Sequence, residues 1–144
     1  QLTKTSSGNE LYSRKNFNEY GDFIGHLDRN INTENKILAH DMTNSKLNEK
    51  ALSRLVCFSE NVKDRNASLF ISFPSIQKET YLKNIIQIDE VYKALSSNKL
   101  ILIDEPGDNI FSDSLLFYSP YHLNWKGREI RTKNLITNLN KKIK

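Results

Sequence analysis

The sequence has little cysteine, glycine and proline, and it has no long apolar run. Cys57 is the only cysteine among 144 residues, which excludes an intrachain disulfide and any zinc site built on cysteines. Five glycines and three prolines are too few for a collagen-like or low-complexity chain. No apolar stretch approaches the roughly 18 residues of a transmembrane helix, and no signal-peptide pattern occurs. With 38% hydrophobic residues, the chain is expected to fold as one domain or part of one.

Positive charge is concentrated at one end of the sequence. The range 126–144 holds seven Lys or Arg and one Glu, so residues 1–125 carry a net charge of −2 within an overall charge of +4. Basic side chains suit the C-terminal end of a helix dipole, and no basic stripe interleaved with aromatics occurs elsewhere. A nucleic-acid or anionic-polymer binder therefore stays open as a third hypothesis, but no nucleic-acid partner is favoured.

Residues 45–144 alternate between helix-like and strand-like patterns. Apolar residues at three- and four-residue steps predict helices over 47–62 and 81–95. Two short apolar runs, at 68–73 and 100–104, predict buried strands. A last helix is expected after Asn124, which is a favourable N-cap residue. This order is typical of a parallel α/β layer.

Residues 1–44 are predicted to be an irregular segment with a short helix near Phe23 to Leu27. Two strands alone cannot form a sheet covered on both faces. Further strands are therefore expected upstream of Gln1 or in a partner chain.

The stretch from Asp104 to Asn124 is too long to be a simple connector. In open α/β sheets, functional groups gather in loops beyond the carboxyl ends of strands. The candidate functional side chains in the stretch from Asp104 to Asn124 are Asp104, Glu105, Asp108, Asp113, Ser119, Tyr121 and His122. A histidine just before a helix N-cap could be the general base for a hydroxyl nucleophile. The alternative is a surface histidine satisfied by local hydrogen bonds.

The stretch "YHLNWKGREIRT" (121–132) resembles the C-terminal catalytic block of the SGNH/GDSL hydrolase superfamily. In that block an Asp-x-x-His element is followed by leucine, asparagine, a glycine and a helix that begins Arg-Thr. The segment "YSRKNFNEYGDFIGHL" is similar to one that precedes the later strands in some bacterial members. "LFISFPS" and "LILIDEP" fall where such proteins have their last two strands. The resemblance covers most of the range 12–139.

This resemblance implies a flavodoxin-like three-layer α/β/α fold with a parallel sheet, of which this chain holds the C-terminal part. It also implies a serine-dependent esterase or O-acyltransferase acting on an acylated carbohydrate or another cell-envelope ester. A location in the cell envelope or periplasm would follow.

By the same resemblance, His122 matches the general base. Ser119 stands where the family has an aspartate, and a hydroxyl can hold an imidazole tautomer but cannot stabilise an imidazolium as a carboxylate does. Asp113 could substitute if the loop folds back. Tyr121, Asn124 and Trp125 are the expected substrate-binding side chains.

The nucleophilic serine is not evident in the sequence. Ser6 and Ser7 precede a Gly-Asn pair, but no strand precedes them, so the serine is expected outside this chain, in the N-terminal part of the same protein. The alternative is a non-catalytic α/β binding or assembly module that has lost its nucleophile. The pairs Asp22/His26 and His40/Asp41 lack a third metal ligand at a suitable spacing, so neither a metal nor a cofactor is expected.

Overall fold

The computed structural model describes residues 13–25 and 37–143. The chain divides into two compact units, Gln1–Asn35 and Lys36–Lys144. In the described part of the first unit, a 3-10 turn, η2 (Arg14–Asn16), precedes an antiparallel bridge between Phe17 and Phe23. Their ring centroids are 5.3 Å apart. The helix expected from Phe23 is not seen up to Gly25, and Leu27 lies outside the described residues.

The second unit is a mixed α/β structure. Its order is α1 (Glu49–Asp64), β1 (Phe70–Ile71), β2 (Ile76–Gln77), α2 (Lys78–Lys83), α3 (Ile85–Ser97), β3 (Ile101–Leu102), η3 (Pro106–Asn109), β4 (Ile110–Phe111), η4 (Asp113–Leu115) and α4 (Trp125–Ile143). The predicted helices over 47–62 and 81–95 correspond to α1 and to the end of α2 with α3. Asn84 separates α2 from α3, as the C-cap of one and the N-cap of the other.

The strands form two short parallel pairs, β1 with β3 and β2 with β4. β1 and β3 lie inside the two predicted strand ranges, but each is only two residues long. Pro74 follows β1 and Pro106 follows β3, and proline cannot donate a hydrogen bond to a ladder. The sequence does not predict β2 and β4, because residues 76–77 precede a helical pattern and residues 110–111 lie in the long loop after Asp104.

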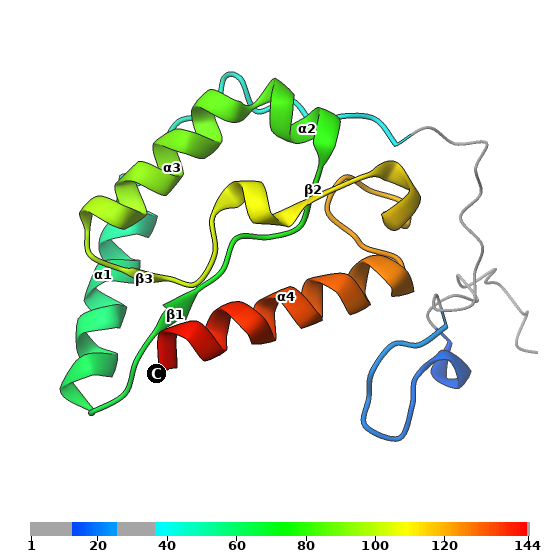
Figure 1. Ribbon diagram of the computed structural model, residues 1–144, viewed down its shortest axis with the longest axis horizontal. Helices are drawn as coiled ribbons and strands as arrows, with labels where there is room; N and C mark the ends of the chain where they lie inside the picture. Colours follow the sequence, from blue (N-terminus) through cyan, green and yellow to red (C-terminus); the bar gives the residue numbers. More distant parts are fainter. Residues whose placement is uncertain (1–12, 26–36, 144) are drawn as a thin grey trace, which may run out of the picture. The chain divides into compact units, whose positions relative to one another are not determined.

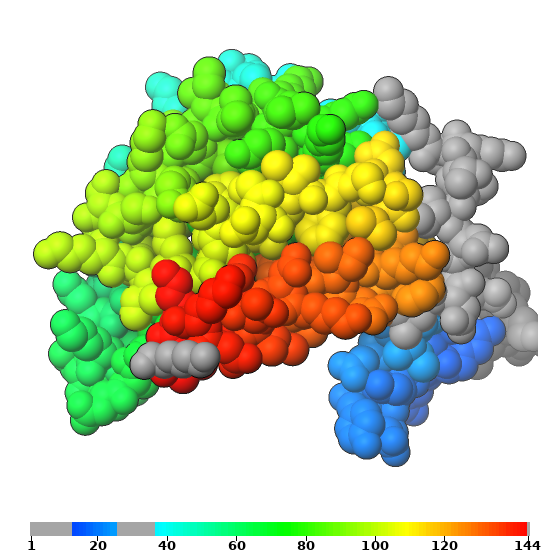
Figure 2. Space-filling view, viewed as in Figure 1, coloured from blue at the N-terminus to red at the C-terminus, as the bar shows by residue number. Residues whose placement is uncertain are grey.

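Helices α3 and α4 lie on either side of the two strand-bearing segments (Figure 1). One hydrophobic cluster, of Phe73, Leu95 and Leu100, is packed against Leu55 and Val56 of α1. A second cluster joins Ile37, Phe111, Leu116 and Leu123 near the start of α4. In the space-filling view, the yellow residues that follow β3 separate green α2 and α3 from orange-to-red α4 (Figure 2).

The start of α4 confirms the predicted cap. The Asn124 side-chain oxygen accepts a hydrogen bond from the Gly127 backbone N–H at 3.0 Å, which satisfies one of the free donors of the first helical turn. Lys141 and Lys142 lie in the last turn, where their charge complements the helix dipole. No helix within residues 13–25 and 37–143 has the length and apolar character that a bilayer span requires.

Candidate functional site

His122 lies in a tight turn that closes just before α4. Its backbone carbonyl accepts a hydrogen bond from the Phe117 N–H at 2.7 Å, and its N–H donates to the Ser119 carbonyl at 3.4 Å. Leu116 and Leu123 form an antiparallel bridge at the base of this turn, and both side chains are buried. The turn is therefore anchored in the core and carries residues 117–122 at its tip.

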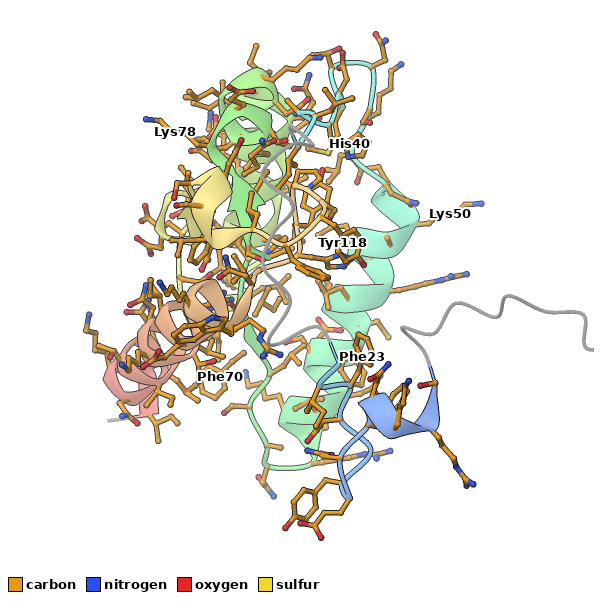
Figure 3. All side chains as sticks on the ribbon, turned by 90° about the vertical axis from the view of Figure 1, so that its right-hand side faces the viewer. Phe23, His40, Lys50, Phe70, Lys78 and Tyr118 are labelled. Carbon is orange, nitrogen blue, oxygen red and sulfur yellow. The ribbon has the colours of Figure 1, made fainter. Side chains whose placement is uncertain are left out.

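The His122 side chain is exposed, and its ring packs against the Tyr118 ring with centroids 4.7 Å apart. In Figure 3 the labelled Tyr118 lies below the labelled His40 in the view. Among the hydrogen bonds and ion pairs of the described residues, none involves a ring nitrogen of His122. Both ring nitrogens are therefore available to an added group.

The two side chains proposed to orient His122 have other partners. The Ser119 hydroxyl accepts a hydrogen bond from the Tyr121 N–H at 3.3 Å. A carboxylate oxygen of Asp113 accepts one from the Gln77 side-chain amide at 2.9 Å. The structure thus places all three residues in the same loop region without joining either proposed partner to the imidazole.

Asn124 and Gly127 have clear structural roles. The Asn124 side-chain amide donates to the Ser114 carbonyl at 2.8 Å, while its oxygen caps α4. Gly127 is buried, and a Cβ atom built there would collide with the Leu115 carbonyl oxygen. Asn124 and Gly127 therefore hold the start of α4 against η4.

Tyr121 is linked to the segment that precedes α1. Its hydroxyl forms a hydrogen bond with His40 Nδ1 at 2.6 Å, and the two rings meet edge to face. The Ser75 hydroxyl donates to the Tyr121 carbonyl at 2.8 Å. Burial raises the pKa of the Tyr121 hydroxyl, so this group stays protonated and can donate a hydrogen bond.

Three fully buried polar side chains hold the extended segment 37–42 against α2. The Gln77 amide donates to the Ile37 carbonyl at 3.0 Å, and the Thr80 hydroxyl accepts from the His40 N–H at 3.1 Å. Asn84 donates to the His40 carbonyl at 2.8 Å and accepts from the Met42 N–H at 2.6 Å. The side chains of Gln77, Thr80 and Asn84 thereby satisfy backbone groups that are not paired in a sheet. Sequence reasoning missed them, although their spacing of three and four residues marks one helix face.

A cavity of about 350 Å³ lies beside this segment. Its floor includes Phe73 and Ile76, which are buried. It is lined by Met42, Ser45, Lys46, Leu47, Phe73, Pro74, Ile76, Tyr81, Gln87, Ile88, Glu90, Val91, Pro106 and Tyr121. Tyr121 thus lines this cavity, and Trp125 does not. Trp125 is half exposed, and the Lys126 ammonium lies 5.4 Å from its ring centroid.

A second buried polar cluster connects the β1–β3 strand pair to α4. The Asp104 carboxylate, whose side chain is 1% exposed, accepts from the Phe73 N–H at 2.7 Å and from the Ser72 hydroxyl at 2.5 Å. Arg131 donates to the Ser72 hydroxyl and to the Phe73 carbonyl. This cluster fixes the middle of α4 against the segments that follow β1 and β3.

The remaining candidates do not form a metal or serine site in the described residues. No group of three or more His, Cys, Asp or Glu side chains suited to a metal ion occurs there. Asp41 pairs with Lys83 at 2.9 Å, and hydrogen bonds from Lys83 and Thr43 lower the pKa of that carboxyl. His26, Ser6 and Ser7 lie outside the described residues.

No protein-family model, curated protein or solved structure matches this chain.

Proposed function

We propose that this chain is the histidine-bearing part of an SGNH-type serine esterase or O-acyltransferase with a flavodoxin-like fold. Its substrate would be an acylated carbohydrate or a related envelope ester. The main support for the proposal is that the His122 ring is exposed and lacks a hydrogen-bond partner among the described residues. In the turn and helix start where Leu123, Asn124 and Gly127 all have packing or capping roles, His122 has an exposed ring with no hydrogen bond from the described residues.

The position of the loop supports this role. β4 ends at Phe111, and residues 112–124 lead from its carboxyl end to α4. This is the side of a parallel strand pair where ligands bind in open α/β sheets. An imidazole without a hydrogen-bond partner at this position can accept the proton of a serine hydroxyl as the serine oxygen attacks an ester carbonyl. It can then give that proton to the leaving alkoxide.

The imidazolium formed in that step needs support that Ser119 does not supply in its present contacts, because its hydroxyl is bonded to the Tyr121 N–H. A carboxylate beside the ring holds the tautomer and stabilises the positive charge. Asp113 is bonded to Gln77 and would have to leave that amide to reach the ring. The mechanism therefore requires either a rearrangement of this loop or an orienting group from elsewhere in the enzyme.

A second candidate function is a non-catalytic binding or assembly module. The contact that favours it is the bond of Asp113 to Gln77, because Gln77 also holds the Ile37 carbonyl. In this interpretation the Asp113 carboxylate stabilises the packing of segment 37–42 and does not orient a catalytic histidine.

The test uses the protein expressed from its complete natural gene, assayed with 4-nitrophenyl acetate. We expect His122→Ala to lower kcat/KM by at least about a hundredfold, the lower end for a general base. Asn134→Ala, an exposed change on α4, serves as the control and should leave the rate unchanged. Hydrolysis at the wild-type rate by His122→Ala would refute the catalytic role, and no hydrolysis by the wild type would favour the binding module.

A further inference from the structure

We propose that the 350 Å³ cavity binds the acyl chain of an uncharged, sugar-headed amphiphile. This inference deepens the proposed function, on which it rests for the ester chemistry, by assigning a place to the apolar part of the substrate. The cavity lies between segment 42–47, α3 and the strand segment that contains Pro74. Tyr121 lines it and is the neighbour of His122 in the sequence, so the cavity and the imidazole share one loop.

The lower part of the cavity suits a hydrocarbon. Phe73 and Ile76, at 8% and 6% exposure, form its floor, and Met42, Ile88 and Val91 add aliphatic or thioether surface. Its volume falls within the range of roughly 300–1,000 Å³ that is typical of small-molecule sites. An apolar chain placed there would be removed from water, which favours binding in proportion to the apolar surface that is buried.

The rim of the cavity is polar and balanced in charge. Ser45, Lys46 and Glu90 are exposed lining residues, which offer hydroxyl, ammonium and carboxylate groups. Because Lys46 and Glu90 carry opposite charges, the charged lining residues have no net charge that would select an anionic or a cationic head group. A sugar bears hydroxyls that both donate and accept hydrogen bonds, so it matches this mixed set.

A second cavity of about 410 Å³ extends the first along α3. The two share Tyr81, Ile88 and Pro106 as lining residues, so they adjoin. Ile85 and Ile86 line the second cavity and are 46% and 76% exposed. An acyl chain longer than the first cavity would continue over these isoleucines, which gives a reason for such exposed apolar side chains.

The experiment is a calorimetric titration of the full chain with dodecyl maltoside below its critical micelle concentration, with maltose as the headgroup control. We expect saturable binding of dodecyl maltoside and none of maltose. Val91→Trp, at a position 36% exposed, places an indole in the cavity and should weaken binding by tenfold or more. Ile136→Trp, on a 53% exposed position of α4 that lines neither cavity, is the matched control and should bind as the wild type does.

Glu90→Trp is a second variant that blocks the cavity from its exposed rim without touching the floor, so its folding is less at risk. Absence of saturable binding, equal binding of maltose, or equal losses in Val91→Trp and Ile136→Trp would overturn the proposal. His122→Ala should bind dodecyl maltoside as the wild type does. If the wild type binds dodecyl maltoside but hydrolyses no ester, the enzyme proposal is rejected and the cavity site stands. If it hydrolyses the ester but Val91→Trp does not weaken binding, the cavity site is rejected and the enzyme proposal stands.

Discussion

Replacing Gly127 with alanine should destabilise the fold, although alanine is the better helix former. In an ordinary helix the exchange would stabilise by up to about 1 kcal/mol. Here the new Cβ would collide with the Leu115 carbonyl oxygen and lie 3.0 Å from Leu123 Cδ2. That carbonyl also accepts the Asn124 N–H at 2.9 Å, so it cannot move without breaking the start of α4. Overpacking of this kind costs about 1–3 kcal/mol, and we expect a net loss of about 1–2 kcal/mol.

The matched control is Gly107→Ala, because a Cβ atom at Gly107 meets nothing within 4 Å. It should stay within about 0.5 kcal/mol of the wild type, as surface substitutions usually do. Both variants are measured by urea unfolding followed by circular dichroism, with the slope of the transition checked for constancy. The reasoning about α4 packing is refuted if Gly127→Ala is as stable as Gly107→Ala or more so.

Two further changes test the polar contacts that hold the second unit together. Asp104→Asn should lower the free energy of unfolding by about 3 kcal/mol, because it removes a buried charge beside Arg131 and leaves the guanidinium without its counter-ion; urea unfolding measures this, and a loss below about 0.5 kcal/mol would contradict it. Asp41→Asn should reduce the loss of stability that the wild type shows at low pH. The hydrogen bond from Lys83 is the first cause of the lowered pKa of Asp41 in the folded protein, so the carboxylate stabilises the fold above the unfolded-state pKa of about 4. This stabilisation is lost as the pH falls below that value. Urea midpoints at several pH values between 7 and 2 test this, and parallel curves for the variant and the wild type would exclude it.

The helices were predictable because their signals are local. Apolar residues recur along one face of α1 and α3, and Asn124 is a favourable cap just before α4. The short strands were only partly predictable. Continuous apolar runs at 68–73 and 100–104 predicted longer strands, but only two residues in each pair with a neighbour. The positions of β2 and β4 depend on contacts between segments more than 30 residues apart, which no local pattern contains.

The loop that carries the candidate residues was predictable from the sequence, but the contacts of their side chains were not. The long loop after the second predicted strand identified the region of His122, and the turn at 117–122 carries it. Tyr121 bonds His40 and Asp113 bonds Gln77. Both contacts join segments more than 30 residues apart, which composition and periodicity do not specify. Gln77, Thr80 and Asn84 are polar side chains that are fully buried, and burial of this kind has no local sequence signal.

The contacts of residues 121–132 distinguish the side chains that build the start of α4 from the one that is proposed to be chemical. Asn124 caps α4 and binds the Ser114 carbonyl, and Gly127 allows α4 to approach Leu115. Any protein that packs a helix in this way would favour those two residue types at this spacing, whether or not it is an enzyme. The exposed ring of His122 packs on the Tyr118 ring, and no hydrogen bond among the described residues involves its nitrogens. The chemical hypothesis therefore depends on His122 alone, and a substitution at that position tests it without disturbing the helix start that the rest of the block maintains.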